Sequence, residues 1–319
     1  MRSKAWCNVD LLIVMYHYVR KIKDSQYPKI KGLEESMFNE QIAYLMKQYS
    51  IISGNELIEA MVTDSIKDLP QSSVLLTFDD GYSDHYQCVL PILRKRKITG
   101  CFFPVVNCVK KRYTMDANKI HYILACTNDV MELIEQIFSL LNQLRSKHGL
   151  ESNGYYWGRY AKANRFDSSE TVFVKGLLQK GLPNEVRREV IDILFKRYVT
   201  TDELTFADNL YMSQHQIEEL KEEGMYIGNH GQSHQWLNTL EPNMQAEEIQ
   251  GGLSFMQEIG MPTNNWIMCF PYGAYDDSLL ALLRTLNCRV GLTTDKGLAD
   301  LSVDNPLTLR RLDTTEIPL

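Results

Sequence analysis

Short apolar runs alternate along the chain with longer stretches in which apolar residues recur at helical spacing. The short runs, rich in β-branched and aromatic residues, predict strands at residues 11–16, 74–78, 100–106, 225–228, 266–270 and 289–293. The longer stretches predict helices at residues 37–48, 55–62, 86–95, 213–222, 244–259 and 277–285. Strands that alternate with helices in this way favour an α/β barrel or a doubly wound parallel sheet.

Residues 111–208 follow a different pattern, because helical spacing continues there without strand-like runs between the helices. Residues 131–144 and 183–198 predict two amphipathic helices, with an aromatic segment at 154–160 between them. We interpret 111–208 as a helical insertion within one catalytic α/β domain of residues 1–319, and we expect it to wall the substrate cleft. Its aromatic rings either pack between helices or stack on a sugar; they are those of Tyr155, Tyr156, Trp157 and Tyr160.

The composition is that of an ordinary globular protein, with 44% hydrophobic and 23% charged residues among 319. Lys and Arg number 34 against 40 Asp and Glu, and the net charge of −6 disfavours nucleic acid as a partner. The seven cysteines are odd in number and form no CxxC pair, which is typical of a reducing compartment. The apolar run at 11–16 is too short for a signal peptide or a transmembrane segment. We therefore expect a cytoplasmic protein, free or at the inner membrane surface.

Two adjacent carboxylates, Asp79 and Asp80, directly follow the second predicted strand at 74–78, and Gly81 comes after them. The carboxyl ends of parallel strands are where sites form, and a glycine there permits a turn sharp enough to bring both carboxylates to one cleft. One carboxylate can then bind a cation while the other takes a proton from water. The alternative is an Asx turn in which both side chains bond to their own backbone.

Two histidines, His230 and His234, follow the predicted strand at 225–228. Imidazoles four residues apart can lie on one side of a helical turn, close enough to share a metal ion. The alternative is one structural hydrogen bond and one solvated ring.

A third motif follows the predicted strand at 266–270 and contains Pro271, Tyr272, Gly273 and Tyr275. The proline fixes φ and the glycine permits a tight turn, so the loop can present backbone N–H groups to an oxyanion. The two tyrosines offer faces for a sugar ring. An ordinary Pro-Tyr-Gly turn without function is the alternative.

Taken in order, the three motifs resemble those of the polysaccharide deacetylases with NodB homology, carbohydrate esterase family 4. That family carries Thr-Phe-Asp-Asp-Gly, then His-xxx-His, then Pro-Tyr-Gly, which stand here at residues 77–81, 230–234 and 271–273. The resemblance covers roughly residues 11–109 and 210–313. It implies a distorted (β/α) barrel with a metal ion at the carboxyl ends of the strands.

The resemblance also implies a role for each motif. Asp79 matches the catalytic base, and the backbone of the Pro271–Tyr272 loop matches the segment that helps to hold the oxyanion. The metal ligands are matched by Asp80, His230 and His234. This ligand set suits a divalent ion, zinc first, although other first-row ions fit as well.

The chain departs from the family at two places. Many members carry an arginine two residues before the proline of the third motif, where this chain has Cys269. Arg311 near the C-terminus either orients Asp79 in place of that missing arginine or forms a surface ion pair.

The family's general acid is a late histidine, but no histidine follows His234. His17, which ends the first predicted strand, is the first candidate for this role, and a structural hydrogen bond is the alternative. His85 begins a predicted helix, and we expect it to be solvated.

The resulting functional hypothesis is a metal-dependent hydrolase that removes an N-acetyl or other N-acyl group from an amino sugar of a glycan or glycan precursor. We expect a soluble or lipid-linked precursor of a cell-surface glycan as the substrate. An N-deformylase of a lipid-linked amino sugar is a close variant of the same chemistry. The alternative of a different class is a catalytically inactive glycan-binding protein on the same fold.

Overall fold

The computed structural model describes residues 10–164 and 167–318, which form two compact units. Unit 1 lies within residues 1–21, 32–113 and 207–319, and unit 2 comprises residues 22–31 and 114–206. The main segment of unit 2, residues 114–206, is thus slightly shorter than the predicted insertion at 111–208, and unit 2 also includes the segment 22–31 from the N-terminal part of the chain. The expectation of one catalytic domain that carries an insertion stays a prediction.

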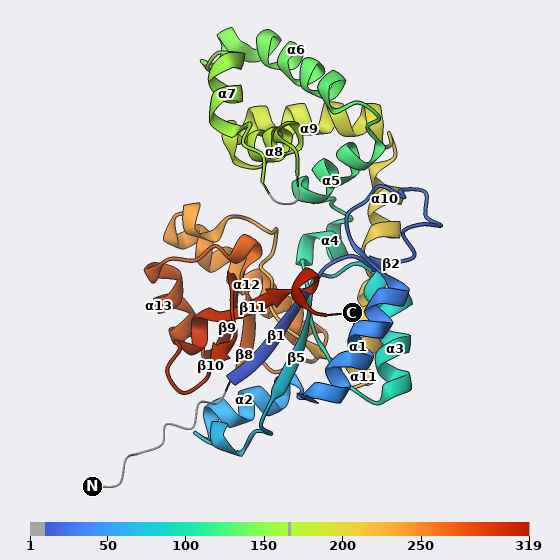
Figure 1. Ribbon diagram of the computed structural model, residues 1–319. Helices are drawn as coiled ribbons and strands as arrows, with labels where there is room; N and C mark the ends of the chain where they lie inside the picture. Colours follow the sequence, from blue (N-terminus) through green and yellow to red (C-terminus); the bar gives the residue numbers. More distant parts are fainter. Residues whose placement is uncertain (1–9, 165–166, 319) are drawn as a thin grey trace, which may run out of the picture. The chain divides into compact units, whose positions relative to one another are not determined.

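The core of unit 1 is a parallel sheet with the strand order β7-β6-β5-β1-β11-β9-β8, surrounded by helices (Figure 1). These strands are β1 (Asp10–Tyr16), β5 (Ser73–Asp80), β6 (Cys101–Pro104), β7 (Tyr226–Ile227), β8 (Trp266–Cys269), β9 (Cys288–Lys296) and β11 (Leu309–Asp313). Two short strands extend it: β4 (Ser50–Ile51) pairs with β5, and β10 (Ala299–Asp300) pairs antiparallel with β1. A separate pair is formed by β2 (Val19–Arg20) and β3 (Leu33–Glu34).

The helices of unit 1 include those predicted from the spacing of apolar residues. They are α1 (Glu35–Gln48), α2 (Gly54–Val62), α3 (Leu90–Arg96), α4 (Val106–Lys111), α11 (Gln214–Glu222), α12 (Pro242–Glu258) and α13 (Asp277–Thr285). Their ends follow from local sequence: Ser53 with Glu56 and Ser213 with Gln216 form capping boxes that satisfy the first N–H groups of α2 and α11.

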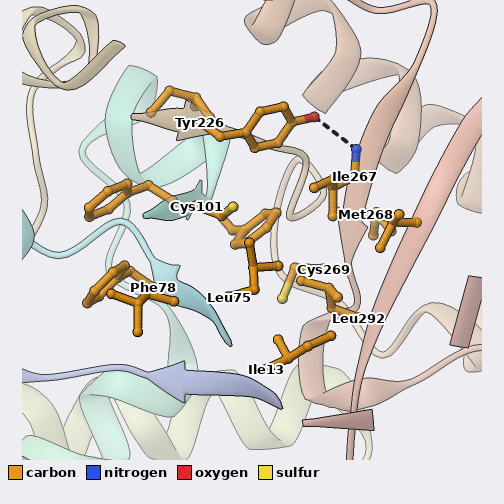
Figure 2. Packing of buried hydrophobic residues seen from close by; sticks show 14 of the residues in the cluster. Ile13, Leu75, Phe78, Cys101, Tyr226, Ile267, Met268, Cys269 and Leu292 are labelled. Atoms are coloured by element: carbon orange, nitrogen blue, oxygen red, sulfur yellow. Dashed lines mark hydrogen bonds between the residues drawn. The ribbon is translucent and has the colours of Figure 1, made fainter. Parts of the chain in front are cut away.

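The two edge strands of the sheet are joined to each other, so the sheet curls into a distorted barrel. Asn229, just after β7, forms a parallel bridge with Met268 in β8. The N–H of Asn229 donates to the Ile267 carbonyl at 3.1 Å, and the N–H of Cys269 donates to the Asn229 carbonyl at 2.9 Å. The hydroxyl of Tyr226 accepts from the N–H of Ile267 at 2.9 Å and adds a further link (Figure 2). The expected distorted (β/α) barrel is therefore confirmed.

Apolar side chains from most strands fill the inside of this barrel. Every residue of β5 is buried, as expected for a parallel strand covered on both faces. Figure 2 shows the packing, which brings together one side chain from each of several strands: Ile13, Leu75, Cys101, Met268 and Leu292. The barrel is thus a packed core, and the space for chemistry lies at its rim.

Unit 2 is helical, as predicted for this part of the chain. Its helices are α5 (Asp116–Cys126), α6 (Val130–His148), α7 (Asn153–Tyr160), α8 (Ser169–Gly176) and α9 (Asn184–Tyr198), and α10 (Glu203–Leu210) leads back to unit 1. Trp157 packs on Phe173 at 5.0 Å between ring centroids, and Tyr156 is buried, so both rings serve helix packing. Within the part of the chain that the structure describes, no helix combines the length and the apolar character needed to cross a membrane.

Candidate active site

The predicted site residues of unit 1 gather at the carboxyl ends of its parallel strands. Asp80 is the last residue of β5, His17 follows β1 directly, His230 follows β7, and Pro271 follows β8. Arg311 lies within β11, between β1 and β9 in the sheet. Because all these strands are parallel, their carboxyl ends share one rim of the barrel, which is where such folds form sites.

The first cluster consists of one carboxylate and two imidazoles. Oδ1 of Asp80 lies 3.3 Å from Nε2 of His230 and 3.3 Å from Nε2 of His234. All three side chains are buried, and one nitrogen or oxygen of each lies within 4.8 Å of the others. Burial disfavours the charged form of Asp80, but the two imidazoles outweigh it and hold the pKa of this carboxyl well below its usual value.

The hydrogen bonds around this cluster leave a gap that a cation fits. Nδ1 of His230 lies 2.7 Å from the Cys269 carbonyl and must donate to it, so in its neutral, metal-ligating form the ring turns the lone pair of Nε2 toward Asp80. Oδ1 of Asp80 is buried and accepts no hydrogen bond from any described residue. A lone pair and a carboxylate oxygen repel unless a cation lies between them. The donor set of one oxygen and two nitrogens therefore fits a divalent metal ion with open positions.

The turn after β5 aims Asp80 at the histidines. Asp80 has φ +74° and Gly81 has φ +75°, two consecutive left-handed conformations that bend the chain sharply. A Cβ on Gly81 would lie 2.8 Å from Cα of Pro104, so only glycine fits there. The hydroxyl of Tyr82 donates to Oδ2 of Asp80 at 2.6 Å. This bond fixes the carboxylate and leaves Oδ1 toward the imidazoles.

The loop that carries both histidines is held by helix α12. The N–H groups of Gln232 and Ser233 donate to Oε2 of Glu248 at 3.0 and 2.8 Å, and the Ser233 hydroxyl donates to Oε1. The side chain of Asn229 donates to the Ile249 carbonyl at 3.0 Å. The histidines are thus positioned mainly through the backbone of their own loop.

The second carboxylate, Asp79, is bound by a buried arginine. The guanidinium of Arg311 donates from Nη1 to Oδ1 at 2.9 Å and from Nη2 to Oδ2 at 2.8 Å, while its Nε donates to the Thr293 carbonyl at 2.7 Å. The thiol of Cys269 donates to Oδ1 of Asp79 at 3.3 Å. Burial raises the pKa of Asp79, but Arg311 together with His17 lowers it to about 2. Since the side chain of Arg311 is 0% exposed, the surface ion pair considered for it is excluded.

His17 lies near the same carboxylate. Its Nε2 is 3.8 Å from Oδ2 of Asp79, too far for a direct hydrogen bond, and its side chain is 40% exposed. The ring is therefore both near the carboxylate and accessible from solvent, as a proton donor to a substrate must be.

The third motif borders the cluster of Asp80, His230 and His234, the candidate metal site. Tyr272 has φ +58°, and its ring lies 4.5 Å from that of His234 and stacks on Trp236 at 4.2 Å with 2° between the planes. One face of Tyr272 is therefore covered by Trp236, which leaves less of this ring for a sugar than we expected. Tyr275 packs on Phe270 at 5.3 Å.

Sequence reasoning missed several residues that hold this site together. The expectation that His85 is solvated is wrong, because its ring is 0% exposed. Tyr82 stands directly beside the Asp-Asp-Gly motif, and that adjacency was a usable signal. Glu248 and Trp236 carry no such signal, since helix α12 and the loop after His234 meet the site only in the folded chain.

The chain is similar in sequence to known proteins. Residues 66–291 match the family model for polysaccharide deacetylases. A stretch of 106 residues is 29% identical to the poly-beta-1,6-N-acetyl-D-glucosamine N-deacetylase of Escherichia coli (strain K12). That stretch covers 33% of this chain but only 15% of the length of the E. coli protein.

Solved structures show the same fold at low sequence identity. The deacetylase PplD of Streptococcus pyogenes, solved in complex with acetate, superposes with a TM-score of 0.59 at 16% identity over 96% of this chain and 92% of that chain. IcaB from Ammonifex degensii gives a TM-score of 0.53 at 18% identity over the same shares, 96% and 92%. A de-N-acetylase from Aggregatibacter actinomycetemcomitans gives 0.55 at 15% identity over 97% of each chain.

Proposed function

Because the chain belongs to the polysaccharide deacetylase family, we propose that it is a metal-dependent hydrolase that removes an N-acetyl group from an amino sugar of a glycan or glycan precursor. The observation that carries this proposal is the unpartnered Oδ1 of Asp80, 3.3 Å from two imidazole nitrogens. The E. coli relative is named for the de-N-acetylation of an N-acetylglucosamine polymer, which supports the substrate class.

The residues in and around the cluster have different roles in the proposed reaction. A divalent ion held by Asp80, His230 and His234 would supply a Lewis acid and lower the pKa of water in the site. Asp79 takes a proton from the attacking water as the oxygen bonds to the acyl carbon and a tetrahedral intermediate forms. His17 then donates a proton to the amide nitrogen as the C–N bond breaks, and acetate and the free amine leave.

Arg311 has a defined part in this scheme. Its two parallel hydrogen bonds hold both oxygens of Asp79 in one plane and keep the carboxylate ionised. With a pKa of about 2, Asp79 is a weak base toward ordinary water, whose pKa is about 15.7. Proton transfer to Asp79 therefore requires a more acidic water, which is why the proposal includes a metal ion.

The loop of Pro271, Tyr272 and Gly273 is assigned to the substrate. It lies against His234 through the ring of Tyr272, so an acyl group near the metal ligands would also meet this loop. Backbone N–H groups at such a place would stabilise the oxyanion of the tetrahedral intermediate.

The test is acyl release by protein of known metal content. We would strip the protein with a chelator, reload it with zinc, cobalt or manganese, and measure acetate and formate released from a panel of N-acyl amino sugars. The Asp80→Ala variant should lose both bound metal and activity, whereas Asp68→Ala, at an exposed carboxylate of the same unit, should retain both.

Three outcomes separate the candidate functions. Acetate release supports the deacetylase, and formate release without acetate release supports the deformylase. Sugar binding without metal uptake or turnover would support the inactive glycan-binding protein. Metal content that is unchanged in Asp80→Ala would contradict the assignment of the cluster.

A further inference from the structure

A buried histidine contacts the backbone of the proposed acid. Nε2 of His85, at the start of the short π-helical turn His85–Val89, lies 2.8 Å from the carbonyl oxygen of His17. A carbonyl can only accept, so Nε2 carries the hydrogen and donates it. The two residues are 68 positions apart in the sequence, and the contact fixes the chain where it leaves β1.

The side chain of His85 lies among aromatic rings, an environment that favours an apolar residue at this position. The rings of Phe78, Tyr82 and Phe102 surround it at centroid distances of 5.6, 5.7 and 5.8 Å. Burial lowers the pKa of His85 to about 4, so the ring is neutral. Its Nδ1 is buried and has no hydrogen-bond partner among the described residues, which costs free energy. A phenylalanine would avoid that cost, so packing alone does not explain a histidine here.

Neighbours of His85 hold the same short segment. Asp84 accepts a hydrogen bond from Nε of Arg20 at 2.6 Å, and both side chains are largely buried. The ring of Tyr18 stacks on that of Tyr82 at 4.2 Å. The chain from residue 17 to residue 20 is therefore held by three residues of one turn, Tyr82, Asp84 and His85.

That turn also reaches the metal-binding cluster. The hydroxyl of Tyr82 donates to Asp80, while His85, three residues later, donates to the carbonyl of His17. One short segment thus contacts both a proposed metal ligand and the proposed acid, so it can fix the distance between them.

We propose that His85 is a positioning residue for His17, because its hydrogen bond to the His17 carbonyl sets the backbone from which the exposed imidazole reaches the substrate. The inference rests on the proposed function, in which His17 protonates the leaving nitrogen. His85 itself does not touch the reacting atoms. Its contribution is the orientation of a group whose misplacement by about 1 Å can cost about 100-fold in rate.

The test compares two substitutions that separate hydrogen bonding from packing. His85→Phe keeps an aromatic ring and removes the donor, and His85→Gln keeps an N–H at a similar reach. We expect kcat of His85→Phe to fall about 10- to 100-fold with KM and metal content unchanged, and His85→Gln to recover most of that loss. His215→Phe, at a histidine whose side chain is 80% exposed, is the matched control and should behave as the wild type.

A double-mutant cycle distinguishes failure of this inference from failure of the proposed function. If His85 acts through His17, the loss caused by His85→Phe disappears in a His17→Ala background. A wild-type kcat in His85→Phe, or a loss of equal size in His85→Gln, would overturn the positioning role. Full activity of His17→Ala would instead overturn the role of His17 as the acid, whatever His85 does.

Discussion

Arg311 and Asp79 meet through two parallel hydrogen bonds of 2.9 and 2.8 Å, although 232 residues separate them in the sequence. Both side chains are almost wholly buried. An arginine fork on a carboxylate fixes the plane of that carboxylate as well as its charge, which a lysine cannot do. The pair therefore couples the stability of the barrel to the orientation of the proposed base.

Replacing Arg311 by alanine should damage both stability and activity. The buried Asp79 loses its partner, and breaking a buried pair in this way costs about 3–5 kcal/mol of the free energy of unfolding. Arg311→Lys should keep more stability and still lose activity, because one ammonium cannot bind both oxygens. Chemical denaturation and kcat/KM measure the two effects, and Arg310→Ala, at the exposed neighbouring residue, is the control. Wild-type kcat/KM in Arg311→Lys would contradict the role given to the fork.

Arg311 also shows which parts of the site could not be predicted from the sequence. The strand β5 and the two histidines were predictable because an apolar run ends directly at the polar motif in each case. β11 was not predicted, since Leu309–Asp313 contains two arginines and no apolar run. Arg311 can lie in the core only because Asp79 neutralises it there, and a partner 232 residues away leaves no local pattern.

The burial of His85 and the inclusion of residues 22–31 in unit 2 were missed for a similar reason. The start of a helix normally faces solvent, but the pocket around His85 is built by Phe78 and Phe102 from neighbouring strands. Residues 22–31 belong to unit 2, where Tyr27 packs on Tyr122 at 4.8 Å. Such contacts depend on tertiary structure, which hydrophobic periodicity does not encode.

Metal binding should stabilise the folded protein, and this stabilisation should depend on the residues proposed to bind the metal. Zinc at about 100 times its dissociation constant should add about 2.7 kcal/mol to the free energy of unfolding, because the unfolded chain lacks the site. His234→Ala should remove that increment. Thermal unfolding with and without a chelator gives the measurement. An equal increment in the wild type and in His234→Ala would place the bound zinc elsewhere.

Acid should weaken unit 2 through Asp167. This carboxylate is largely buried and binds Lys175 at 2.7 Å and also Lys31, and although burial opposes ionisation, the two lysines lower its pKa. A lowered carboxyl pKa gives stability above the unfolded pKa of about 3.9 that is lost as the pH falls through the folded value. Asp167→Asn should cost about 1–3 kcal/mol at neutral pH and flatten the pH dependence below pH 4. Thermal unfolding as a function of pH tests this, with Asp24→Asn at an exposed position of unit 2 as the control.

Glu248 should control metal affinity without contacting the metal. Its carboxylate accepts hydrogen bonds from the N–H groups of Gln232 and Ser233, which lie between the two histidines. Glu248 therefore sets the shape of the loop that carries His230 and His234. Loss of such an outer partner typically lowers metal affinity about 10- to 100-fold. We expect that loss in Glu248→Gln, measured by competition with a chromophoric chelator. Glu247→Gln changes an exposed residue of the same helix by the same chemistry and should bind zinc as the wild type does. Equal affinities in the two variants would show that the loop keeps its shape without the carboxylate, and that its own turn alone positions the histidines.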